Sequence, residues 1–146
     1  MYKFLFSLSL SLCILTLSHG QDQKSPSFEE VLSLQGVSGA TISPNGKHVV
    51  FSKSAVDWKE NRYDRELWLS KDGGEPFQLT NNPKGNSNGP IWSPDSKWIA
   101  FIAAHGDKSQ IRAIRVDGGT SFQVTHRENG INGFEWSPDG KQLAFL

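Results

Sequence analysis

One short segment has the residue types of a serine nucleophile. Gly85-Asn86-Ser87-Asn88-Gly89 matches the G-x-S-x-G pattern, in which the serine hydroxyl is exposed on a strained turn between a buried strand and a helix. Here Asn81-Asn82-Pro83-Lys84 comes before the serine and Pro90-Ile91-Trp92 comes after it, which is typical of a loop followed by a strand. We therefore predict that Ser87 is not a catalytic residue.

Metal and nucleotide chemistry are not indicated either. His48 is expected in a strand, and His105 and His126 in loops, with no i, i+4 pair and no cysteine nearby to complete a metal site. Asp72 and Asp117 each begin an Asp-Gly-Gly triplet, but a calcium loop needs further oxygen ligands at alternating positions. No phosphate-binding glycine loop or dinucleotide fingerprint occurs. The sequence thus predicts no catalytic, cofactor-binding or metal-binding residue, and no cofactor.

Glu29 and Glu30 are adjacent carboxylates near the start of the chain. Glu30 follows Ser27 at the spacing of a capping box, and apolar residues come next, so we predict a short helix from about Phe28 to Ser33. Adjacent residues of a helix do not face each other, whereas carboxylates in the first turn are favourable to the helix dipole. The pair therefore indicates a helix start and not an acid and base.

A repeated turn motif organises the rest of the chain. Residues 42–51, 92–101 and 136–145 align without gaps, and their serines recur at intervals of 50 and 44 residues. In Ser-Pro-Asp-Gly, proline sets the backbone for a type I turn, serine and aspartate bond the local backbone, and glycine leads into the next strand. The β-branched and aromatic residues that follow favour a strand buried on both faces.

A second repeat lies between these turns. Residues 67–80 align with residues 112–125, and each segment contains Asp-Gly-Gly, which tolerates the positive φ of a tight hairpin. Each repeat therefore has four short strands, as in a β-propeller blade. The connection from 52 to 66 is five residues longer than its counterpart. We expect a solvated loop there, with a contact surface as the alternative.

The sequence predicts an all-β fold, namely a partial β-propeller of about two and a half four-stranded blades, preceded by a signal peptide and a short helix. In residues 1–20, Lys3 precedes a 14-residue apolar run and small residues, which is typical of a cleaved leader and too short for the ~20 residues of a membrane span. The expected division is 21–39 as an N-terminal segment with the helix and 40–146 as the incomplete propeller. Blade 1 covers about 40–80, blade 2 about 90–125 and a truncated blade 3 begins at about 134.

Composition restricts the partners and the compartment. The 15 basic side chains balance the 15 acidic ones, so nucleic acid is not an expected partner. The single cysteine, Cys13, lies in the leader, so the mature chain has no disulfide. We expect a secreted or periplasmic protein with no membrane association once the leader is removed.

Several segments carry a family resemblance: 28–34, 37–38, 42–47, 67–68, 78–80 and 92–95. The chain resembles the amino-terminal propeller segment of an acylaminoacyl-peptidase-like member of the prolyl oligopeptidase family of serine peptidases, with WD40-like and TolB-like repeats. The resemblance implies a propeller of about seven blades that caps an α/β-hydrolase domain. It places the catalytic serine, aspartate and histidine beyond the propeller. Ala40, Asn45 and Ser96 depart from the common proline, aspartate and glycine of the pattern.

The resemblance implies a function for the parent protein. We expect an N-terminal β-propeller fragment of a secreted serine peptidase that gates access of peptide substrates to a downstream hydrolase domain, absent from this chain. The chain alone should then be inactive. Because propellers close with four to eight blades, we expect a truncated product or a partial sequence. The alternative is a non-enzymatic TolB-like propeller that binds protein partners in the periplasm.

Overall fold

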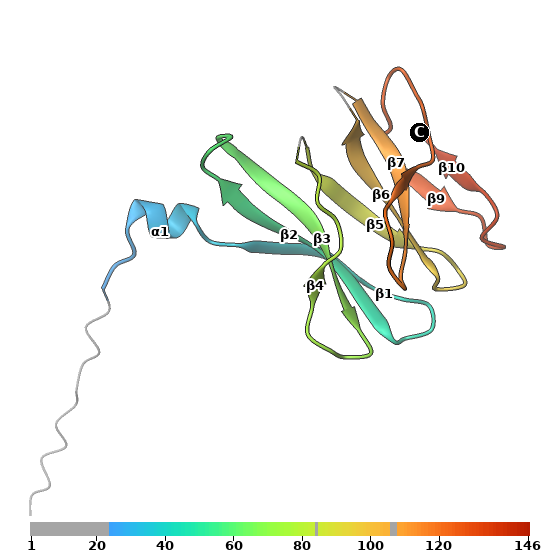
Figure 1. Cartoon of the computed structure of the whole chain (residues 1–146), viewed down its shortest axis with the longest axis horizontal. Coiled ribbons are helices and arrows are strands. Elements are labelled where there is room, and N and C mark those ends of the chain that lie inside the picture. The colour runs from blue at the N-terminus through green and yellow to red at the C-terminus, as the bar shows by residue number, and fades with distance from the viewer. Residues whose placement is uncertain (1–23, 84, 106–107) are drawn as a thin grey trace, which may run out of the picture.

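The computed structural model describes residues 24–83, 85–105 and 108–146. The expected leader therefore lies outside the described residues. Helix α1 (Phe28–Leu32) confirms the predicted short helix, and both bonds of its capping box are present: Glu30 N donates to Ser27 Oγ and Ser27 N donates to a carboxylate oxygen of Glu30. None of the helix residues is buried, and the helix leads into the first strand (Figure 1).

The strands of the described residues form three antiparallel sheets that follow one another along the chain (Figure 1). The first sheet has the order β1-β2-β3-β4 and the second β5-β6-β7-β8, while β9 and β10 form the third. This sequential order is that of propeller blades, so the predicted all-β propeller fold is confirmed; we call the sheets blades 1, 2 and 3. The strands are β1 (Gly36–Ile42), β2 (His48–Asp57), β3 (Arg62–Lys71), β4 (Phe77–Gln78), β5 (Ser87–Trp92), β6 (Trp98–His105), β7 (Lys108–Arg115), β8 (Phe122–Gln123), β9 (Phe134–Trp136) and β10 (Leu143–Phe145).

The predicted turns join the first two strands of each blade. In blade 2, Ser93 Oγ donates to Asp95 Oδ1 at 2.6 Å and accepts from Trp98 N at 2.9 Å. Blades 1 and 3 have the same two bonds at their own turns. The fourth turn residue has a positive φ, 73° at Gly46 and 61° at Ser96, which explains the glycine that is usual there.

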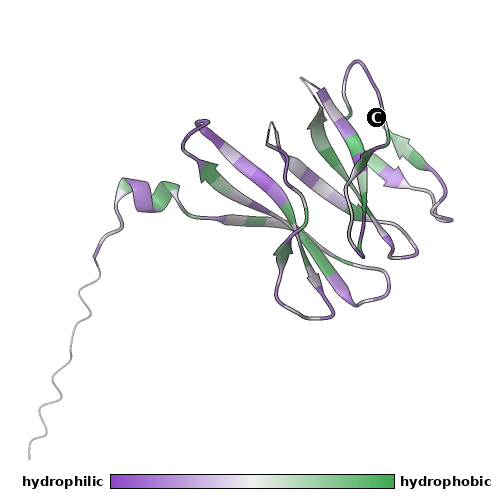
Figure 2. Ribbon diagram, viewed as in Figure 1, coloured by the Kyte–Doolittle hydropathy of each residue, from purple (hydrophilic) through white to green (hydrophobic). Residues whose placement is uncertain are grey.

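The hydrophobic core lies between the blades. Three fully buried side chains of blade 1, Val50, Leu67 and Leu69, belong to one cluster with Trp92, Ile99 and Phe101 of blade 2. A second cluster joins blades 2 and 3. Figure 2 shows hydrophobic residues along the middle of blade 2, whereas the tip of the β2–β3 hairpin is hydrophilic.

Tryptophan side chains also form hydrogen bonds between consecutive blades. Trp92 Nε1 donates to the carbonyl of Thr41 at 3.1 Å, and Trp136 Nε1 donates to the carbonyl of Ile91 at 3.3 Å. Each tryptophan thus bonds the innermost strand of the preceding blade. The polar edge of a buried indole needs such a partner, so the two bonds also set the spacing of consecutive blades.

The gapless alignment of 67–80 with 112–125 is right for β4 and β8 but wrong by one residue for β3 and β7. Leu67 N donates to Thr80 Oγ1, and the corresponding bond in blade 2 comes from Ile111 N to Thr125 Oγ1. Leu67 therefore corresponds to Ile111, and the extra residue of blade 2 lies in the turn between β7 and β8. A turn can absorb an insertion, whereas a one-residue slip in a strand would move every side chain to the other face.

The prediction of a solvated loop over 52–66 is also wrong. Ala55 pairs with Asp64, and Asp57 pairs with Arg62, so that β2 and β3 continue as one long hairpin. In blade 2 the corresponding pair is His105 with Lys108. The charged residues support the hairpin locally, because Arg62 lies 3.0 Å from Asp64 and 3.8 Å from Asp57.

Candidate functional site between the first two blades

Ser87 lies at the start of β5, where its backbone pairs with Ala103. The predicted loop-to-strand context is therefore confirmed, and no helix follows the serine in the described part of the chain. The side chain is 1% exposed, and its hydroxyl has no hydrogen-bond partner among the described residues. A buried hydroxyl without a partner carries a desolvation cost, which makes Ser87 noteworthy for a reason other than nucleophilic catalysis.

The titratable residues singled out in the sequence serve separate local structures. His48 begins β2 and stacks on Trp92 with ring centroids 6.2 Å apart, while His105 ends β6 and His126 follows β8 outside any strand. Within the described ranges, no three His, Cys, Asp or Glu residues are grouped so that they could hold a metal ion.

The turn aspartates have lowered pKa values for local reasons. The hydroxyl of Ser93, and then the backbone N–H of Lys97, lower the pKa of the Asp95 carboxyl. Ser137 and Lys141 have the same effect on the pKa of Asp139. Asp117 differs, because a bidentate pair with Arg115, at 2.8 and 2.7 Å, lowers its pKa. Each carboxylate thus has a partner within its own turn or strand end.

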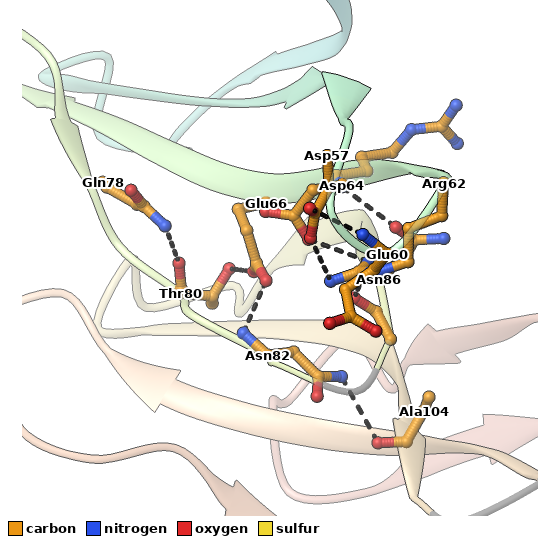
Figure 3. A network of polar contacts seen from close by, with 12 residues as sticks. Asp57, Glu60, Arg62, Asp64, Glu66, Gln78, Thr80, Asn82, Asn86 and Ala104 are labelled. Atoms are coloured by element: carbon orange, nitrogen blue, oxygen red, sulfur yellow. Dashed lines mark hydrogen bonds and ion pairs between the residues drawn. The ribbon is translucent and has the colours of Figure 1, made fainter. Parts of the chain in front are cut away.

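A buried carboxylate fixes the connection between blades 1 and 2. Glu66 on β3 is 3% exposed. Its two oxygens accept from Thr80 Oγ1 and from Asn82 N, both at 2.5 Å (Figure 3). Thr80 Oγ1 in turn accepts from Leu67 N at 2.9 Å. The carboxylate therefore holds the start of the β4–β5 connection against the edge of blade 1.

Gln110 occupies the corresponding place in blade 2. Its Oε1 accepts from Thr125 Oγ1 and from Arg127 N, both at 2.9 Å, and its Nε2 donates to the carbonyl of Arg127 at 2.7 Å. A neutral amide thus makes the bonds that the carboxylate makes in blade 1. The sequence analysis missed both residues, although the recurring threonine after β4 and β8 was a signal for a partner one strand away.

The β4–β5 connection is also held from the neighbouring hairpins. Arg62 Nη1 donates to the carbonyl of Gly85 at 3.1 Å, and Asn86 Oδ1 accepts from Arg65 N at 2.9 Å. On the blade 2 side, Asn82 Nδ2 donates to the carbonyl of Ala104 at 3.4 Å (Figure 3). Asn82, Gly85 and Asn86 consequently bridge the two blades through these bonds.

A cavity of about 360 Å³ lies beside this bridge. Its walls come from the β4–β5 connection, the start of β5, the face of β6 and β7 that points toward blade 1, and the β7–β8 turn. The lining residues are Thr80, Asn81, Asn82, Pro83, Ser87, Phe101, Ala103, Ala104, Arg112, Thr120 and Ser121. We call this space the inter-blade cavity.

Arg112 is the cation of the inter-blade cavity. Its Nε donates to Ser121 Oγ at 3.0 Å and its Nη2 donates to the carbonyl of Ser121 at 2.7 Å. Ion pairs of the described residues use Arg62, Lys97 and Arg115, and none includes Arg112. The sequence analysis missed Arg112 because the misaligned repeat placed it opposite an apolar leucine.

Several sequence relatives of this chain are named as peptidases. It is 34% identical over 118 residues to "Dipeptidyl-peptidase 5" of Porphyromonas endodontalis and 37% identical over 118 residues to the protein of that name from Porphyromonas gingivalis. Each match covers 80% of this chain, and the chain spans 17% of the length of these relatives. It is also 29% identical over 107 residues to "Uncharacterized peptidase YuxL" of Bacillus subtilis. No family model matches.

Solved structures show the same fold. An acylaminoacyl peptidase of Pyrococcus horikoshii superposes with a TM-score of 0.62 and 20% identity, over 77% of this chain and 17% of that one. The resemblance predicted from the sequence is confirmed: the chain resembles the propeller segments of peptidases in sequence and in fold.

Two further structures place the propeller segment within its fold group. The β-propeller domain of the Trilobed protease from Pyrococcus furiosus has a TM-score of 0.59 at 21% identity, over 76% of this chain and 33% of that one. TolB from Acinetobacter baumannii has a TM-score of 0.54 at 21% identity, over 73% and 25%. Within the part of the chain that the structure describes, no helix is long and apolar enough to span a membrane.

Proposed function

We propose that the propeller segment belongs to a secreted serine peptidase of the prolyl oligopeptidase family, in which it restricts the access of peptides to a hydrolase domain. The observation that carries the proposal is the match to named peptidases together with the blade order of the sheets. The proposal includes a cleaved leader over 1–20 and a propeller that begins at about residue 40. The relatives' name suggests release of dipeptides as the reaction of the parent protein.

The arrangement of the inner strands supports a restricting role. Strands β1 and β5 are the first strands of their blades and contact each other. The Trp92 bond to Thr41 ties the blades close to these inner strands. In a closed ring, inner strands surround a central channel, so bonds of this kind would keep the channel narrow.

Hydrolysis by the complete gene product tests the enzymatic part of the proposal. We expect release of chromophore from dipeptide substrates, loss of that release on serine-directed inhibition, and labelling by a fluorophosphonate probe. This chain alone should show none of these activities. Hydrolysis by this chain would contradict the proposal, and so would a complete product that the probe does not label.

A series of peptide lengths tests the restricting role. We expect kcat/KM of the complete product to fall steeply as the peptide is lengthened around a constant cleavage site. Trp92→Phe keeps the aromatic packing but removes the bond to Thr41, so it should raise the relative rate on long peptides. Trp58→Phe is a matched control, because Trp58 is 58% exposed and lies in the β2–β3 turn. Equal length dependence in both variants would contradict restriction by the blades.

A TolB-like binding role is the second candidate, favoured by the structural likeness to TolB. Under that role the complete product is not labelled by fluorophosphonate and retains a stable protein partner from the periplasm. Probe labelling at one serine outside the propeller would exclude it.

A further inference from the structure

We propose that the inter-blade cavity binds a small ligand through a carboxylate group, with Arg112 as the cationic contact. The inference is independent of the proposed peptidase activity, because the cavity walls come only from blades 1 and 2 and the connections at their edges. It rests on the surroundings of the guanidinium, on the fixed walls and on one unpartnered hydroxyl.

The guanidinium of Arg112 makes no ion pair with the described residues, and its surroundings are neutral. Arg112 is half-buried and shares the cavity with Phe101, its cross-strand partner, and with Ala103. Its two recorded bonds both go to Ser121, which supplies neutral acceptors. A partly buried cation without an anion is costly, and a planar guanidinium is well suited to a carboxylate. An anionic ligand would therefore offset a cost that is built into this site.

Comparison with blade 1 shows that the cation is particular to blade 2. The register places Trp68 opposite Phe51, as it places Arg112 opposite Phe101. In blade 1 the nearby cation is Lys53, whose Nζ lies 4.2 Å from the Trp68 ring centroid. Blade 2 has alanine at the position of Lys53 and arginine at the position of Trp68. The Arg112 side chain of blade 2 consequently lies at the cavity without the cation–π contact that Trp68 gives to Lys53 in blade 1.

Several polar groups of the cavity are held in place before a ligand arrives. Glu66 fixes Thr80 and the backbone of Asn82, and Ser121 fixes Arg112. Ser87 lines the same cavity with a hydroxyl that has no partner among the described residues. A preformed site loses little conformational freedom on binding, and about 360 Å³ falls within the range of small-molecule sites.

The carboxylate could come from a free small acid or from the C-terminus of a short peptide. We would titrate the whole chain with three probes: acetate, acetyl-Gly-Gly with a free C-terminus, and acetyl-Gly-Gly amide. Ligand-observed saturation-transfer NMR measures binding even if the protein self-associates. Tighter binding of the free peptide than of acetate supports the site and assigns it to peptide termini, and equal binding supports the site and assigns it to free acids.

Variants test the role of Arg112. We expect Arg112→Met to weaken binding of the preferred acid about tenfold or more, as loss of a charge-assisted bond implies, and Arg112→Lys to have an intermediate effect. Arg115→Met is the matched control, because Arg115 is on the same strand and already pairs with Asp117. The proposal would be overturned if the unmodified chain bound the peptide amide as tightly as the free acid, or bound neither of them. It would also be overturned if a folded Arg112→Met variant bound the preferred acid with unchanged affinity. The first comparison needs no variant to fold.

Discussion

Glu66→Gln is expected to leave the free energy of unfolding nearly unchanged, although it removes the charge of a carboxylate that is 3% exposed. Gln110 shows how an amide fills this place: one oxygen accepts two bonds and the nitrogen donates to a backbone carbonyl. At position 66 the same amide can accept from Thr80 and Asn82 and donate to the Asn82 carbonyl. No cation pairs with Glu66 among the described residues. The substitution therefore has two opposing effects on the free energy of unfolding: it weakens the hydrogen bonds that the charge strengthens, and it removes the cost of burying that charge. We expect a net change within about 1 kcal/mol.

Glu66→Ala sets the scale for this comparison. It leaves Asn82 N and the Thr80 hydroxyl without their acceptor. An unsatisfied buried group costs about 1–3 kcal/mol, so the two together predict a loss of about 2–6 kcal/mol. Gln110→Glu is the reciprocal control. It buries a charge and removes the donor to the Arg127 carbonyl, so it should destabilise the chain although Glu66→Gln does not.

The assay is urea unfolding followed by tryptophan fluorescence, at the lowest usable protein concentration and with the m-value required to stay constant. The expected order of midpoints is unmodified chain and Glu66→Gln together, then Gln110→Glu, then Glu66→Ala. If Glu66→Gln cost as much as Glu66→Ala, the charge itself would hold the connection, and the equivalence of the two blades would be refuted.

Three further predictions concern the turns and the blade edges. Ser96 has a φ of 61°, and its Oγ accepts from Asn45 N at 3.0 Å across the blades. Ser96→Ala should lower the free energy of unfolding in urea by about 1 kcal/mol, because that bond is lost. Ser96→Gly should leave it nearly unchanged, because relief of the left-handed strain offsets the lost bond. Equal losses in both would show that strain is irrelevant there. The lowered pKa of Asp95 and Asp139 means that their stabilisation is complete above the unfolded value, which is near 3.8, and is lost as the pH falls through the lower folded values. The urea midpoint should therefore drop below about pH 4, and less so in Asp95→Asn, since Asn45 already serves this turn in blade 1; an identical acid response in that variant would contradict the assignment. Finally, β10 has a partner on one side within the described sheets, and Leu146 beside it is 93% exposed, so the chain should self-associate with rising concentration in sedimentation experiments. A monodisperse, cooperatively melting monomer would contradict this.

The turns could be predicted from the sequence because their chemistry is local. Serine, proline, aspartate and glycine meet their partners within five residues, as the Ser93 bonds to Asp95 and Trp98 show. The helix cap is local in the same way. These patterns were sufficient for the number of strands in each blade and for the fold class.

The cavity and its buried polar contacts could not be predicted, because they depend on strand register. Glu66 meets Thr80 and Asn82 across β4, and Arg112 meets the β7–β8 turn nine residues away. A single extra turn residue displaced the aligned repeat and hid the correspondence of Arg112 with Trp68. The long hairpin of blade 1 was missed for a related reason: its polar residues suggested solvent, but cross-strand pairing and the ion pairs of Arg62 determine its shape.

One position at the end of the first strand of each blade is not equivalent in the three repeats. Trp92 and Trp136 each donate to the preceding blade, and Ile42 occupies the same position in blade 1. An isoleucine has no donor, and Ile42 is 65% exposed. A sheet that packed against this face of blade 1 would therefore be held by contacts other than the indole bond. The polar positions of this face also differ from those of its counterpart: Lys53 and Ser70 stand where blade 2 has Ala103 and Ile114, whereas Trp68 stands where blade 2 has Arg112. Because apolar burial is the main source of blade packing energy, a sheet on this side of blade 1 would depend on apolar contacts such as those of Phe51 and Trp68 and not on an indole bond.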